Sequence, residues 1–129
     1  MAKVKLGLAL QQALNELAVI VRQKKALINK TNLPELNVNY LEIKNIFYGV
    51  LYAILKSHDD YLGCKINITA TRDLNDPKWV IAFHANARSF NEYLTQNIQA
   101  AVEKLGGNLE IGKSLKGVYV KFTLPYDKD

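Results

Sequence analysis

Cysteine is almost absent from this 129-residue sequence, since Cys64 is the only one. A single thiol can form no internal disulfide, so bridges are excluded as a source of stability and a reducing compartment is the default expectation. Long apolar runs are also absent: no stretch approaches the roughly 20 apolar residues that a membrane span needs. Residues 1–12 have too short an apolar stretch for a signal peptide. We therefore expect a cytoplasmic protein without a membrane span.

Proline-rich, glycine-rich and low-complexity linkers are missing as well, although 49% of the residues are hydrophobic. A chain of this length and composition can bury one core without disulfides or a structural metal. We therefore expect one compact domain.

Acidic residues are scarce at one end only. Residues 1–32 hold six basic residues and one acidic residue, which accounts for the whole net charge of +5, because residues 33–129 hold 11 of each. Any anionic partner, nucleic acid or membrane surface would therefore have to bind residues 1–32. The neutral remainder argues against nucleic acid as the main ligand.

The apolar spacing predicts one long amphipathic helix from residue 4 to about residue 30, with basic residues near its C-terminal end. Six of its positions follow alternating steps of four and three, the spacing of a coiled-coil seam, in which a single lysine is the polar interruption. These positions form the predicted homodimer interface: Leu10, Leu14, Leu17, Val21, Lys24 and Ile28.

The remaining pattern predicts two helices and two hairpins. Asn39 and Glu42 form a capping arrangement for a helix over 40–58, and Ser89 and Glu92 repeat it for a helix that Gly106 ends. Runs rich in β-branched and aromatic residues predict hairpins from 64–73 with 78–85 and from 108–112 with 117–125, and a short strand is expected near residue 37. This order predicts an α/β fold of the α+β two-layer type, a mixed sheet with helices on one face.

The run AAVEKLGGNLEIGKSLKGVYVKFTLP, residues 100–125, contains a helix ending in Leu-Gly-Gly, a strand, a glycine turn and a strand closing in Leu-Pro. Together with LEIKNIFYGVLYAILKS, residues 41–57, it resembles the ATPase domain of sensor histidine kinases, a Bergerat-fold domain. The resemblance covers about residues 37–125. It implies an ATPase-like domain over 33–129, with the helix of 1–32 in the place of the kinase dimerisation and phosphoacceptor region.

The residues that this family uses for magnesium are missing. The family has an asparagine on the helix that matches residues 41–57. The corresponding position here is Ala53 or, after a shift of one residue, Tyr52. Neither side chain can replace an amide oxygen as a ligand for a hard cation.

The glycine boxes are missing too. In HANARSF, residues 84–90, Ala85 stands for the adenine-binding aspartate, while Ala87 and Ser89 stand for glycines. The second box falls at Glu92 and Leu94, with no room for an ATP lid before it, and a glutamate there repels phosphate. The resemblance therefore implies a degenerate domain that holds no nucleotide, metal or other cofactor.

Other chemistry has little support in the sequence. His58 and His84 lack partners at metal-ligand spacing, and nothing near Cys64 marks an activated thiol. The carboxylates Asp59 with Asp60 and Asp73 with Asp76 fit solvated helix ends and turns better than acid/base pairs. Residues 1–32 contain no histidine, which argues against a phosphotransfer role.

We therefore expect a non-enzymatic signalling or assembly module that binds a protein partner, such as a signalling protein, and forms a homodimer. Two alternatives remain open: a working nucleotide-binding kinase or ATPase with an unusual site, and a binder of nucleic acid or anionic surfaces through the basic N-terminal helix.

Overall fold

The computed structural model describes residues 3–58, 63–73, 75, 77–88, 90–91 and 95–125. Their elements, in chain order, are β1 (Val4–Lys5), α1 (Leu6–Glu16), α2 (Ala18–Gln23), β2 (Leu27–Lys30), β3 (Glu35–Leu36), α3 (Tyr40–Ser57), β4 (Lys65–Asp73), β5 (Lys78–Ala85), α4 (Gln96–Lys104), β6 (Leu109–Ser114) and β7 (Gly117–Pro125). The main sheet has the order β2-β4-β5-β7-β6, while β1 and β3 form a separate small pair.

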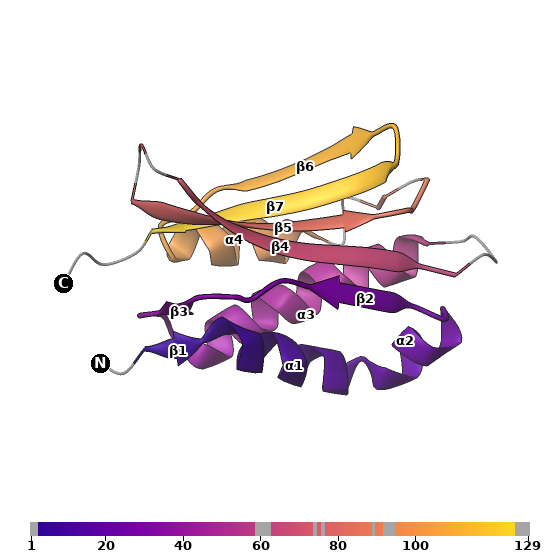
Figure 1. Ribbon diagram of the computed structural model, residues 1–129, viewed down its shortest axis with the longest axis horizontal. Helices are drawn as coiled ribbons and strands as arrows, with labels where there is room; N and C mark the ends of the chain where they lie inside the picture. The colour runs from indigo at the N-terminus through magenta and orange to yellow at the C-terminus, as the bar shows by residue number, and fades with distance from the viewer. Residues whose placement is uncertain are drawn as a thin grey trace.

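The main sheet is mixed. Strand β2 runs parallel to β4, and the other neighbouring strands are antiparallel. Figure 1 shows the sheet as one layer and the helices together on one of its faces. Every second residue of β7 is buried under the helices, as expected of a sheet with one covered face: Val118, Val120, Phe122 and Leu124. The predicted α+β two-layer sandwich is thus confirmed.

Helix α3 forms where the capping pattern predicts it. The Asn39 side chain accepts a hydrogen bond from the Glu42 backbone N–H at 3.0 Å, which satisfies one of the free donors of the first turn. Phe47 of this helix packs against Phe83 and Phe122 of the sheet, with ring centroids 6.1 and 6.0 Å away. The two predicted hairpins are also present, as β4 with β5 and β6 with β7.

The single long helix predicted for residues 4 to 30 is wrong. Helix α1 ends at Glu16, α2 ends at Gln23, and Lys25 then adopts a positive φ of 51°. Residues 27–30 form β2 instead, because the Leu27 N–H bonds to the Cys64 carbonyl at 2.8 Å and the segment completes the sheet beside β4. Tertiary pairing has overridden a helical apolar pattern.

Residues 3–32 therefore contribute to the same sheet and core as the rest of the chain. Helix α1 packs against α3, and its buried side chains join the core cluster that reaches Leu124: Leu6, Ala9, Leu10 and Ala13.

The predicted start of the last helix is also wrong, although its end is confirmed. Phe90 and Asn91 are not helical, and α4 begins at Gln96. Ser89 and Glu92, the proposed caps, lie outside the described residues. At the other end Gly106 has a φ of 85°, the left-handed conformation expected after a helix. Among the described residues, no helix is long and apolar enough to cross a membrane.

Candidate functional site

The magnesium position implied by the resemblance carries no oxygen ligand. Ala53 lies in α3 with 0% of its surface exposed. The alternative, Tyr52, is half-buried and stacks on Tyr48 with ring centroids 6.1 Å apart and planes 6° apart, while the Lys56 ammonium lies 5.8 Å from the Tyr52 ring. These aromatic and cationic groups offer packing surface and no carboxylate or amide.

Helix α4 covers part of the same face of α3. A Cβ atom added to Gly49, one turn before Ala53, would lie only 2.8 Å from Ile98 Cγ1 of α4. The helix that approaches α3 at Gly49 is therefore α4. An ion pair of 3.0 Å between Glu42 and Lys104 also joins α3 to α4.

The first glycine-box position lies at the end of β5. Ala85 and Ala87 are buried, so their methyl groups contribute to packing. The polar neighbour, Asn86, is committed at both ends of its amide: Oδ1 accepts from the Lys65 N–H at 2.8 Å, and Nδ2 donates to the Gly63 carbonyl at 3.2 Å. The residues matched to the second box, Glu92 and Leu94, lie outside the described residues.

The six residues of the predicted dimer seam do not form one stripe. Leu10 and Leu17 lie in the core, with 0% and 3% of their surface exposed. The Lys24 ammonium donates to the carbonyl oxygen of His58, which ties the end of α2 to the end of α3. Ile28 lies in β2, so it cannot continue a helical seam. The seam geometry that motivated the prediction is therefore absent, and the homodimer itself stays a prediction.

Three of the six seam residues lie together on the surface: Leu14, Val21 and Ile28. They line an open groove of about 580 Å³ between α1, α2 and the start of β2, which we call the edge groove. Its complete lining is Gln11, Leu14, Asn15, Ala18, Val21, Arg22, Lys25, Ala26, Leu27 and Ile28. The sequence analysis named these three positions as part of a dimer seam, but it did not place them in one groove with Ala18 and Leu27.

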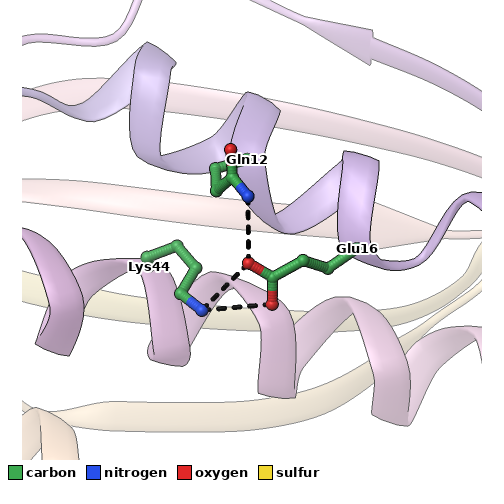
Figure 2. Close-up of polar contacts among 3 residues, drawn as sticks. All are labelled: Gln12, Glu16 and Lys44. Atoms are coloured by element: carbon green, nitrogen blue, oxygen red, sulfur yellow. Dashed lines mark hydrogen bonds and ion pairs between the residues drawn. The ribbon is translucent and has the colours of Figure 1, made fainter.

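One ion pair links α1 to α3. The Lys44 ammonium lies 3.1 Å from both carboxylate oxygens of Glu16, and the Gln12 amide donates to the same carboxylate at 3.2 Å. Figure 2 shows the three side chains meeting between the two helices. The hydrogen bonds from Lys44 and then Gln12 lower the pKa of Glu16 below its ordinary value of 4.5. The pair adds a polar contact to the apolar packing that holds α1, which forms one wall of the groove, against α3.

The remaining reactive groups do not assemble into a catalytic site within the described residues. His58 is buried and neither ring nitrogen has a hydrogen-bond partner, whereas His84 is exposed. Burial raises the pKa of the Cys64 thiol to about 11, while the Lys24 ammonium acts in the opposite direction. The Asp73 carboxylate is engaged in its turn, where it accepts from the Asn75 N–H at 2.9 Å. Among all the residues that the structure describes, no three His, Cys, Asp or Glu side chains lie close enough together to hold a metal ion.

The fold is of the α+β sandwich class. Helices cover one face of a five-stranded mixed sheet, and a capped helix precedes the first hairpin. No protein-family model and no curated protein matches the sequence. Solved structures do match. The catalytic domain of the histidine kinase ThkA, in a nucleotide-free form, has a TM-score of 0.80 at 12% identity, covering 97% of this chain and 95% of that chain.

Two further kinases agree. The Acinetobacter baumannii histidine kinase AdeS has a TM-score of 0.77 at 9% identity, over 98% of this chain and 68% of that chain. The mycobacterial sensor histidine kinase MprB has a TM-score of 0.74 at 11% identity, over 97% of both chains. The chain thus has the fold of histidine kinase catalytic domains, and a fold by itself assigns no activity.

Proposed function

We propose that this chain is a non-enzymatic, cytoplasmic signalling or assembly module, in which a histidine kinase catalytic fold is kept as a scaffold for binding protein partners. The observation that carries the proposal is the side chain that α3 places at the position implied for magnesium. Ala53 has no ligand oxygen and no exposed surface, and α4 packs through Ile98 onto Gly49 one turn away. This part of α3 thus offers packing atoms and no ligand oxygen for a hard cation.

The residues at the end of β5 also support a function without nucleotide. An adenine site needs an acceptor that is free to bond the base, whereas Ala85 has none and the Asn86 amide already bonds the backbone at Gly63 and Lys65. Freeing that amide would break both hydrogen bonds, each of which contributes about 0.5–1.5 kcal/mol.

The competing function is a nucleotide-dependent kinase or ATPase of the same fold. A ligand that binds only the folded state stabilises it by about 2.7 kcal/mol when its concentration is 100 times Kd. For a domain of this size that corresponds to a rise in Tm of roughly 10 °C. We expect no rise in Tm with ATP and Mg²⁺, in an assay where a histidine kinase catalytic domain serves as the positive control. A saturable rise in this chain would refute the non-enzymatic proposal.

Self-association is a narrower form of the proposal. Three of the six predicted interface residues, Leu14, Val21 and Ile28, line a surface groove, so a contact between two copies remains open to test. Light scattering measures it directly, because the chain mass is 14.6 kDa and a dimer has twice that mass. A monomer at high concentration would refute the homodimer and leave binding to a different protein untouched.

A further inference from the structure

The edge groove combines an apolar floor with a basic rim. Leu14, Val21 and Ile28 are partly buried against the core, whereas Leu27 keeps 61% of its surface exposed. Arg22 and Lys25 stand among these side chains, and the groove lining contains no Asp or Glu. Within the described residues, neither Arg22 nor Lys25 has a carboxylate partner.

Strand β2, which forms one wall, is an edge of the main sheet. Among the residues that the structure describes, β4 is its one strand neighbour. The N–H groups of Leu27 and Thr31 point toward β4, where they bond Cys64 and Ile68 carbonyls at 2.8 and 3.0 Å. Because backbone groups alternate in direction along a strand, those of Ile28 and Lys30 point away from β4 toward the free edge. An edge of this kind is a template for an added strand.

A second cavity of about 530 Å³ continues along β2. It is lined by Lys5, Lys30 and Glu35 among others, and Gln11 belongs to both cavities. Across the junction the Lys30 ammonium bonds Gln11 Oε1 at 3.4 Å, a long contact that an incoming backbone can displace. The space beside the free edge therefore follows β2 and suits an extended ligand.

We propose that the edge groove binds an extended acidic segment of another protein, which adds to β2 as a further strand. This inference rests on the proposed partner-binding function and specifies the partner's chemistry. Main-chain bonds to Ile28 and Lys30 supply affinity, and alternate side chains supply specificity. Apolar side chains of the segment lie on Leu14 and Val21, and its carboxylates reach the rim cations.

Charge separates this occupant from the other candidates. A second copy would bring Arg22 and Lys25 near like charges, at the end of the chain that holds the whole net charge of +5. A nucleic acid would meet an aliphatic floor without the aromatic side chains on which bases stack. An acidic strand can pack apolar side chains on the floor, pair its carboxylates with the basic rim, and form backbone hydrogen bonds with the free edge of β2.

The test uses a fluorescein-labelled nine-residue peptide of alternating valine and glutamate, with a matched peptide in which lysine replaces glutamate. Fluorescence anisotropy with the full chain should give saturable binding of the acidic peptide and none of the basic one. Addition of salt should weaken the binding, since partly exposed charge pairs are screened. Absence of binding by the acidic peptide at low salt would overturn the inference.

Two double variants locate the binding site. The double variant Arg22→Glu with Lys25→Glu should weaken the affinity for the acidic peptide roughly tenfold. The control, the double variant Lys113→Glu with Lys116→Glu, changes the net charge of +5 by the same four units at two exposed positions, one in β6 and one in the β6–β7 turn. It should leave the affinity within about twofold. Equal losses in both double variants would show nonspecific charge attraction and overturn the inference.

The backbone part of the inference has its own control. Lys30→Pro removes an outward N–H, whereas Lys30→Gln removes only the charge, so proline should weaken binding several-fold more than glutamine. Thermal melts establish that each variant is folded. Equal affinities for the two variants would overturn strand addition.

Other results would identify another occupant. Binding of a single-stranded oligonucleotide at equal affinity, or a dimer mass that Leu27→Asp reduces to that of one chain, would overturn the acidic-strand inference. The proposed function fails separately, through a rise in Tm with ATP and Mg²⁺. A chain that binds neither ATP nor the acidic peptide refutes only the inference about the groove.

Discussion

Leu14 and Leu17 are three residues apart, yet the structure gives them opposite roles. Leu17 joins the core at the junction of α1 and α2 with 3% of its surface exposed, whereas Leu14 is half-buried and lines the edge groove. A coiled-coil seam would make the two leucines equivalent. Leu17→Arg and Leu14→Arg therefore distinguish the observed packing from the seam.

The expected losses of stability differ by several kcal/mol. Removing the Leu17 side chain costs about 2–5 kcal/mol, by comparison with buried leucines replaced by alanine. An unpaired buried cation adds several kcal/mol more. Since small domains are stable by about 5–15 kcal/mol, Leu17→Arg should be largely unfolded. At Leu14 the arginine can extend into solvent, so its cost should stay near 1 kcal/mol.

Urea denaturation followed by circular dichroism measures both losses, and Leu17→Ala provides a variant that still folds. Its Tm should fall by about 4 °C for each kcal/mol lost, or roughly 8–20 °C in all. If Leu17→Arg were as stable as the unchanged chain while a dimer dissociated, Leu17 would lie at an interface and the assigned core would be wrong.

Three further measurements test individual contacts. Asn39→Ala removes the cap of α3 and should cost about 1 kcal/mol in urea denaturation, with Asn39→Asp retaining most of it; equal losses would contradict the cap. The Cys64 thiol, with its pKa raised to about 11 by burial, should react with a thiol reagent at pH 7 only upon unfolding, so rapid reaction of the native chain would contradict its burial. Because the folded pKa of Glu16 is lowered, its pairing with Lys44 stabilises the fold above the ordinary value of 4.5, and the benefit disappears as the pH falls through the folded pKa. Glu16→Gln should therefore be less stable than the unchanged chain at pH 7 and equally stable at pH 2; a gap that persists in acid would contradict the linkage.

Local signals predicted most of the fold. Asn39 with Glu42 marked the start of α3, and Gly106 marked the end of α4, because caps act within one turn of the chain. The two hairpins were readable because their strands and turns are contiguous in sequence. Each of these elements is specified by residues close to it.

The strand β2 was missed because its signal is not local. Leu27 and Ile28 fit helical steps of three and four, and neither glycine nor proline marks the break before them. What makes them a strand is the parallel ladder with β4, in which Leu27 lies opposite Lys65. The edge groove could not be predicted for the same reason: its walls come from two helices and a strand that the sequence presented as one helix.

The parallel pairing of β2 with β4 also has a consequence for synthesis. The two strands lie 38 residues apart in register, with α3 between them. At about 5–20 residues per second, β2 waits roughly 2–8 seconds on the ribosome before β4 exists. An unpaired strand can join another nascent chain, and charged residues beside its apolar side chains oppose that association. Lys25 and Lys30, on either side of the apolar pair Leu27 and Ile28, are placed to act as such gatekeepers until the sheet closes.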